Sequence, residues 1–255
     1  MRNVLTIFQK ELRSYFDSPV AWGLMAFFAV LAGLMFNGVV QNFIFVGIQT
    51  QMQGRPVPLD MNEYVIRPFF LNINVVGLFL IPMITMRTFA EEKRTGTIEL
   101  LVTSPVRDIE IIIGKWLAAT ALYIIITSIA LLDLSVLFFY GKPDWKPVVV
   151  GYLGLVLQGS ALLAIGCFLS SLTRNQIIAG AGTFAVSLAL YIITWLTEFS
   201  QDASAKAVGY MSVLQHYEPF SKGVVDSKDV VFFLTLAFLG LFLTARSMES
   251  MRWRA

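Results

Sequence analysis

The stretch VVVGYLGLVLQGSALLAIGCFLSSL, residues 148–172, contains no charged side chain. A helix needs roughly 20 consecutive apolar residues to cross the hydrocarbon core of a bilayer, so this stretch is long enough to span a membrane. Five further apolar runs accompany it, and the last of them should continue toward Met248. We expect spans at Val20–Val40, Pro68–Met86, Trp116–Tyr140, Val148–Leu172, Ile177–Leu196 and Val230–Ala245.

The composition supports this interpretation. Hydrophobic residues make up 56% of the 255 residues and charged residues 14%, whereas soluble domains carry about 25% charge. We therefore predict an all-α membrane protein of six transmembrane helices, with one membrane domain covering residues 1–255. A single cysteine and a single histidine rule out an intrachain disulfide and a zinc site built on several such ligands.

The N-terminal segment, residues 1–17, has the pattern of an amphipathic helix. Leu5, Phe8, Leu12 and Tyr15 recur at helical spacing, and basic residues lie between them. Such a helix is expected to lie in the membrane interface, and the alternative is a soluble extension. Pro19 should end it and let the chain turn into the membrane.

The Lys and Arg residues of the connections indicate the orientation, because cytoplasmic loops carry an excess of them. One side is richer in cations, and it holds Arg2, Lys10, Arg13, Arg87, Lys93, Arg94, Arg107, Lys115, Arg174, Arg246, Arg252 and Arg254. The other side holds Arg55, Arg67, Lys142, Lys146, Lys206, Lys222 and Lys228. Both termini are therefore predicted to be cytoplasmic.

The most informative connection is RTFAEEKRTGTIELLVTSPVRDIEIIIGK, residues 87–115. It mixes charges of both signs with apolar residues, Gly96 should break it into two short helices, and Thr97 can cap the second. This pattern favours docking into a groove on a soluble partner, with apolar anchors and charges that set the register. The alternative is a solvated loop that only retains positive charge. The candidate docking residues are Phe89, Glu91, Glu92, Lys93, Gly96, Thr97, Glu99, Leu100 and Leu101.

Polar residues elsewhere allow two interpretations each. Asp133 and Gln158 lie inside expected spans, where they could serve a transport pathway or, as we favour, hydrogen bonds between helices. His216, Glu218 and Phe220 lie in the outer loop 197–229, where a structural role is favoured over a metal or catalytic pair formed by the histidine and the glutamate.

Several segments resemble the permease subunits of ABC-2-type transporters, with the gliding-motility-type permeases as the most similar group. They are FAEEKRTGTIELLVTSPV at 89–106, GKW at 114–116, SSLTRNQIIAG at 170–180 and HYEPFSKGVVDSKDVVFF at 216–233. The resemblance implies a bacterial inner-membrane protein, with 1–17 as a connecting helix, 87–105 as a coupling helix and 197–229 as short outer helices. It also implies that two permeases, identical or sister chains, assemble with two cytoplasmic ATPases.

No cofactor and no nucleic acid is expected on this chain, since ATP and Mg²⁺ would bind to the ATPase. A phosphate-binding loop reads Gly-x-x-x-x-Gly-Lys-Ser/Thr, but Gly114–Lys115 is followed by Trp116 and has Ile109 in place of the first glycine. A periplasmic accessory protein is a further expected partner. The alternative function is a non-transporting membrane anchor of an envelope or motility machine. An intramembrane enzyme is disfavoured, because Asp133 is the only acid deep inside an expected span.

Overall fold

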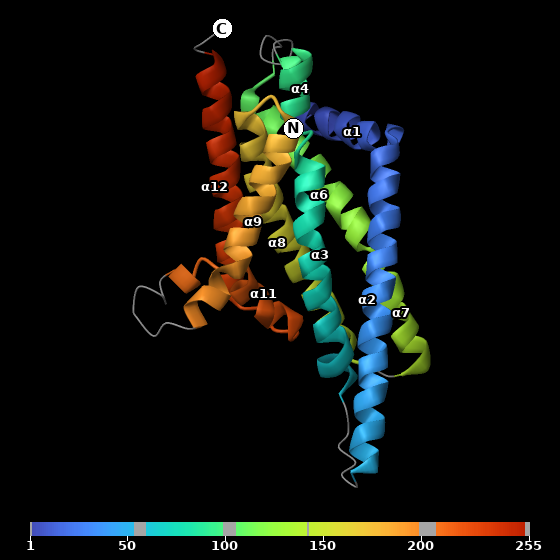
Figure 1. Cartoon of the computed structure of the whole chain (residues 1–255). Coiled ribbons are helices and arrows are strands. Elements are labelled where there is room, and N and C mark those ends of the chain that lie inside the picture. The colour runs from blue at the N-terminus through green and yellow to red at the C-terminus, as the bar shows by residue number, and fades with distance from the viewer. Residues whose placement is uncertain (1, 54–59, 99–105, 142, 199–207, 253–255) are drawn as a thin grey trace.

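The computed structural model describes residues 2–53, 60–98, 106–141, 143–198 and 208–252, and the described residues are almost entirely helical (Figure 1). The helices follow one another as α1 (Arg2–Asp17), α2 (Pro19–Met52), η1 (Asn62–Ile66), α3 (Arg67–Thr85), α4 (Ala90–Thr95), α6 (Asp108–Thr127), α7 (Ile129–Tyr140), α8 (Trp145–Leu172), α9 (Gln176–Glu198), α11 (Val213–Ser221) and α12 (Ser227–Arg252).

Six stretches of the described chain are helical, long and apolar enough to cross a membrane: Pro19–Met52, Asn62–Thr95, Asp108–Tyr140, Trp145–Leu172, Gln176–Trp195 and Ser227–Ser250. Five of them contain one of the runs expected from the sequence, and Gln176–Trp195 covers the fifth run except Leu196, so the predicted all-α fold with six membrane-spanning helices is confirmed. The protein is a multi-pass membrane protein.

The third of these helices begins earlier than expected, at Asp108 rather than Trp116. Asp108 and Glu110 occupy its first turn, where carboxylates interact favourably with the positive end of the helix dipole. The Glu110 carboxylate also accepts a hydrogen bond from the Arg107 backbone N–H. Hydropathy alone finds only the apolar part of this helix and misses its charged beginning.

Pro19 separates α1 from α2, as predicted. It occupies the start of α2, where a proline needs no hydrogen-bond partner for its nitrogen. Ser18 is extended and its hydroxyl accepts a hydrogen bond from the Val20 N–H. As a result α1 lies across one end of the bundle, the end at which α4 and the last turns of α12 also lie (Figure 1).

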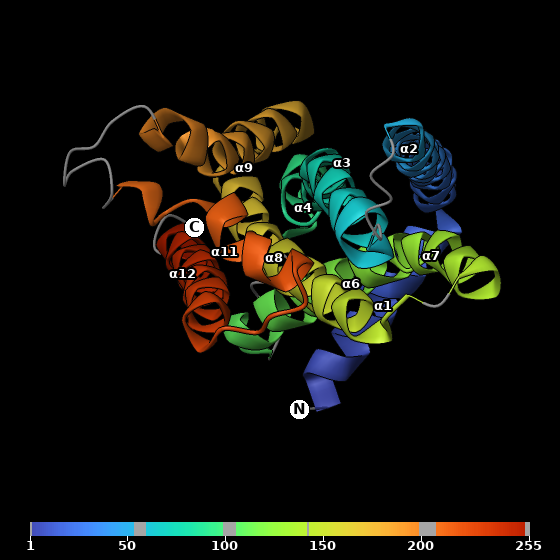
Figure 2. The ribbon, with the colours of Figure 1, turned by 90° about the horizontal axis from the view of Figure 1, so that it is seen from below.

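Helix α8 is the centre of the bundle and contacts α3, α6, α9, α11 and α12. Figure 2 shows it between α12 at one side and α2 at the other. Small residues permit these close approaches: a Cβ at Gly166 would lie 2.5 Å from the Thr85 hydroxyl oxygen, and one at Gly154 would lie 2.5 Å from the Phe220 Cβ. The uncharged run that defines the fold in sequence is therefore also the helix against which most others pack.

Helix α2, by contrast, does not pack most of its apolar side chains against the other helices. Trp22, Phe27, Val30 and Leu34 are exposed, and Ala21, Leu24 and Phe28 are among the few buried residues. An exposed apolar helix surface is stable in lipid or against a second subunit, which agrees with a helix at the edge of a membrane protein.

The contact between α12 and α8 provides a test of this packing. A Cβ at Gly240 would lie 2.6 Å from the backbone carbonyl carbon of Ala164, which cannot move aside as a side chain can. We expect Gly240→Ala to lower the free energy of unfolding by about 1–3 kcal/mol. Thermal unfolding of the purified protein in detergent, followed by circular dichroism, measures this.

The matched control is Gly182→Ala in α9, because nothing lies within 4 Å of a Cβ at that position. It should leave stability unchanged or raise it slightly, since alanine favours helices by about 1 kcal/mol over glycine. Equal unfolding temperatures for the two variants would contradict the close α8–α12 contact.

Candidate functional site

A buried lysine joins three helices at the end of the bundle where α1 and α4 lie. The ammonium group of Lys115, on α6, donates hydrogen bonds to the carboxylates of Glu11 on α1 at 3.0 Å and of Glu92 on α4 at 2.8 Å. The Lys115 side chain is only 2% exposed, and its Nζ lies 5.6 Å from the centre of the Phe89 ring. We call Glu11, Glu92 and Lys115 the Lys115 cluster.

The Lys115 cluster depends on the close packing of α1 against α6. Gly114 makes this possible, because a Cβ there would lie 2.8 Å from the Ile7 side chain and 3.2 Å from the Val4 carbonyl oxygen. The Asn3 side-chain amide also donates a hydrogen bond to Glu110 at 3.0 Å. The amphipathic N-terminal segment is thus fixed to the beginning of α6 along most of its length.

The short helix α4 is attached to the end of α8. The Ser170 hydroxyl accepts hydrogen bonds from the backbone N–H groups of Phe89 and Ala90, both at 3.1 Å. The Lys93 ammonium donates a hydrogen bond to the Ser171 carbonyl oxygen, which also accepts one from Ser247 at 3.3 Å. A cation at a helix C-terminus is favourable because the carbonyls there carry partial negative charge.

Beyond this attachment the chain becomes exposed. Arg94, Thr95, Gly96 and Thr97 are all exposed, and we call these four residues the exposed tip. Gly96 has φ +76, a left-handed conformation that ends α4, so the predicted break at Gly96 is confirmed. The Thr97 hydroxyl lies 2.9 Å from that of Thr95.

The candidate docking residues therefore divide into three groups. Phe89 is completely buried, and Glu92 and Lys93 bond within the chain, so these three hold the segment in place. Gly96 and Thr97 face outward, and Glu91 is half-buried. Glu99, Leu100 and Leu101 lie outside the described residues.

Sequence reasoning did not identify Lys115, Glu11 or Ser170 as parts of this site. In the sequence Lys115 stood out as a cation of a basic connection and as part of the Gly114–Lys115–Trp116 segment, and neither feature indicated a buried ion pair. Glu11 lies 104 residues from Lys115 in the chain. No local pattern connects residues so far apart, so that pairing required the fold.

The outer-loop residues lie at the other end of the bundle, where His216 and Glu218 bind different partners rather than each other. Glu218 binds Arg67 at 2.9 Å and Lys222 at 2.8 Å, and these cations hold the pKa of its carboxyl below the usual value, with the Lys222 hydrogen bond as the larger cause. His216 instead lies 2.6 Å from an Asp229 carboxylate oxygen, and Phe220 is fully buried.

The His216 ring is held on all sides. Its other nitrogen donates a hydrogen bond to the Tyr210 carbonyl oxygen at 2.9 Å, and the ring stacks on Phe232 with centroids 3.9 Å apart. Among the described residues, no group of three or more His, Cys, Asp or Glu side chains could hold a metal ion. This arrangement connects α11 to the beginning of α12.

The two polar residues inside the spans behave differently. Gln158 on α8 exchanges two hydrogen bonds with Asn74 on α3, at 2.7 and 2.8 Å, and both side chains are buried. Asp133 lies on α7, and its Oδ2 atom is buried without a hydrogen-bond partner in the described part of the chain. The role favoured for Asp133, hydrogen bonding between helices, stays a prediction.

This geometry defines a class of protein: a helical membrane protein with a short helix exposed at one end and bonded to its central helices. Comparison with known families then identifies it. A model of the ABC-2 family transporter protein matches residues 5–226, and the chain belongs to this family.

Two curated relatives are the probable multidrug ABC transporter permeases YbhR of Escherichia coli K12 and of Escherichia coli O157:H7. Each is 24% identical to the chain over 181 residues, which cover 65% of this chain. The same match covers 46% of each relative, so the chain spans about half the length of these proteins.

The Lys115 cluster predicts a strong effect of neutralising the lysine. In Lys115→Met two carboxylates remain close together without their cation, and removing one partner of a buried ion pair costs about 3–5 kcal/mol. We expect thermal unfolding in detergent to occur at clearly lower temperature than in the wild type. The control is Lys10→Met, since Lys10 is exposed on the same helix as Glu11. Equal losses of stability in both variants would contradict a buried, stabilising cluster.

Proposed function

We propose that this chain is the membrane-spanning permease subunit of an ABC transporter, and that a separate ATP-hydrolysing subunit docks on the exposed tip and the segment that follows it. In this proposal the end that carries α1 and α4 is cytoplasmic and the protein lies in a bacterial inner membrane. The segments assigned to that side, which include both termini and residues 87–115, carry more Lys and Arg than those of the opposite side, and this supports the orientation.

The observation that carries the proposal is the attachment of the exposed tip to the core. Arg94 and Gly96 are exposed, whereas Phe89, directly before α4, is buried and hydrogen-bonded to Ser170 at the end of α8. Glu92 connects the same helix to α6 through Lys115. A force applied at the tip would therefore reach the central helix and the third span directly.

The energy would come from another chain. Lys115 is the lysine of the only Gly-Lys pair near this segment, and its ammonium group is bound to Glu11 and Glu92. It is buried and unavailable to a nucleotide phosphate. ATP and Mg²⁺ would bind to the partner ATPase, and this chain would transmit the resulting movement.

The function and the subunits of the complex are proposed from the resemblance of residues 89–106 and 216–233 to gliding-motility-type permeases. We propose export or mechanical transmission across the membrane, by a complex of two permease subunits, identical or sister chains, with two ATPases and a periplasmic accessory protein. The relatives' names point to multidrug transport, which makes a cationic dye a reasonable first probe.

The exposed tip gives the direct test. Gly96→Ala forces an alanine into a left-handed conformation, which costs roughly 1–2 kcal/mol, and Glu92→Gln removes one carboxylate from the Lys115 cluster. We expect both to lower ATP-driven uptake of ethidium into inside-out vesicles by about fivefold or more, while membrane insertion is retained. The vesicles contain the chain together with its ATPase.

The controls are Gly38→Ala, where nothing lies within 4 Å of the added Cβ, and Glu249→Gln, whose side chain is exposed on α12. Co-purification of the ATPase is measured in parallel. Failure to recover any ATPase with the wild-type chain, or full activity of Gly96→Ala and Glu92→Gln, would contradict the proposal. ATPase binding without ATP-dependent dye movement would favour the membrane anchor.

A further inference from the structure

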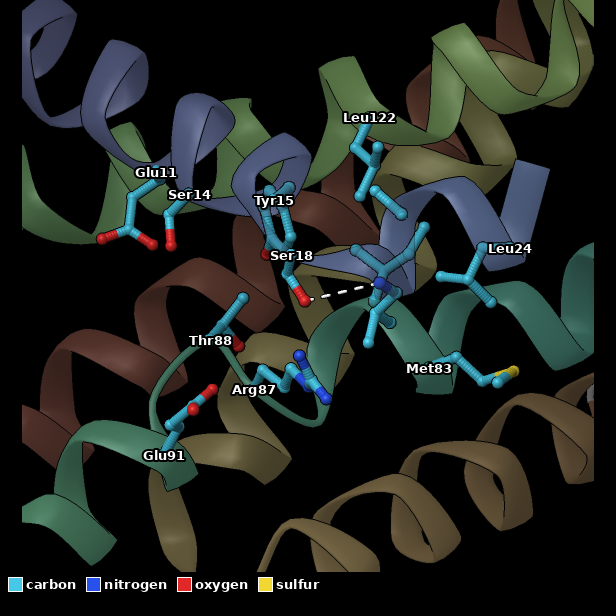
Figure 3. Close-up of a pocket in the computed structure, with 13 residues that line it drawn as sticks. Glu11, Ser14, Tyr15, Ser18, Leu24, Met83, Arg87, Thr88, Glu91 and Leu122 are labelled. Carbon is cyan, nitrogen blue, oxygen red and sulfur yellow. Dashed lines mark hydrogen bonds between the residues drawn. The ribbon is translucent and has the colours of Figure 1, made fainter. Parts of the chain in front are cut away.

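A cavity of about 230 Å³ lies beside the Lys115 cluster, where α1 turns into α2 and the end of α3 approaches both (Figure 3). Its walls come from α1, the start of α2, the end of α3, α4 and α6. The polar wall includes Ser14, Ser18, Arg87, Thr88 and Glu91. Glu11 of the Lys115 cluster lines it as well.

The cavity contains a cation that forms no ion pair with a described acid. Arg87 lines it, and the Nε atom of this guanidinium is buried without a hydrogen-bond partner among the described residues. Glu91 lines the same cavity, but no described cation forms an ion pair with its carboxylate, Arg87 included. Both charges are thus available to a ligand.

The polarity of the wall changes in order from one side of the cavity to the other. In Figure 3 the carboxylates of Glu11 and Glu91 lie at one side, Arg87 lies in the middle near Ser18, and Leu24 and Met83 lie at the other side. Met83 is 40% exposed, so the apolar side reaches the surface that faces lipid in a membrane protein. The order is negative, then positive, then apolar.

We propose that this cavity binds the headgroup of a zwitterionic aminophospholipid, phosphatidylethanolamine, from the leaflet in which α1 lies. Its phosphate pairs with the Arg87 guanidinium, which suits planar, bidentate recognition of phosphate. Its ammonium group pairs with the Glu91 carboxylate, and an acyl chain leaves past Met83. Glu11 is already bound to Lys115 and stays with it.

Size and charge both favour this ligand. Sites that enclose drug-sized molecules have volumes of about 300–1,000 Å³, so a cavity of about 230 Å³ suits a headgroup rather than a whole amphiphile. An anionic lipid would satisfy Arg87 but would bring its negative charge near Glu91 and Glu11. A zwitterion satisfies the cation and the free carboxylate together.

The test is native mass spectrometry of the full-length chain, purified in detergent and freed of lipid. The chain is titrated separately with phosphatidylethanolamine and with phosphatidylglycerol, and soluble phosphoethanolamine is added as a competitor. We expect one phosphatidylethanolamine per chain, bound more tightly than phosphatidylglycerol. Arg87→Gln should weaken it by about tenfold. No ATPase is present, so the result does not depend on the proposed function.

A second variant tests the ammonium contact. Glu91→Gln should weaken phosphatidylethanolamine but leave phosphatidylglycerol binding equal or stronger, and the exposed control Arg94→Gln should change neither. Equal phosphatidylethanolamine binding by all variants would overturn the site. Phosphatidylglycerol binding as tight as phosphatidylethanolamine would overturn the zwitterion assignment. Displacement by equimolar phosphoethanolamine would show that a soluble phosphate ester, not a lipid, is the ligand.

Discussion

The structure depends on one buried charge. Lys115 loses almost all contact with solvent, and an ammonium group removed from water is stable only when its charge is compensated. Glu11 and Glu92 provide that compensation, and they come from two helices, α1 and α4, that both precede the lysine in the sequence. For this reason α1, α4 and α6 must stay together. Neither the N-terminal helix nor the exposed tip can move far from the third span without exposing or separating these charges.

The central helix α8 extends this constraint through the bundle. At one end Ser170 and Ser171 hold α4, and farther along Gln158 holds α3 through Asn74. Near its other end Gly154 lies against Phe220 of α11, the same short helix whose Glu218 binds Arg67 at the start of α3. Polar contacts thus connect one end and the middle of α8 to neighbouring helices, and a small residue allows close packing near its other end. Such an element is suited to carry a displacement from one end of a membrane protein to the other.

The sequence predicted what the bilayer dictates and missed what the fold alone brings together. Six apolar runs, the break at Pro19 and the turn at Gly96 follow from local chemistry, and all were predicted. The Lys115 cluster could not be, because residues 11, 92 and 115 share no local pattern. The sequence left open a metal or catalytic pair of His216 and Glu218, but residues two apart on a helix point in different directions. The partner of His216 is Asp229, on the next helix. The long start of α6 was hidden because its first turn is charged.

Our central proposal is that the Lys115 cluster holds an ATPase-docking segment at the cytoplasmic face. Cys167, the only cysteine, is completely buried, so a single cysteine introduced as Thr97→Cys can be labelled against little background. The most direct measurement is reaction of that variant with a membrane-impermeant maleimide in inside-out and right-side-out vesicles. The account predicts rapid labelling in inside-out vesicles, protection in right-side-out vesicles, and slower labelling when the partner ATPase is bound. Labelling from the right-side-out face would contradict it.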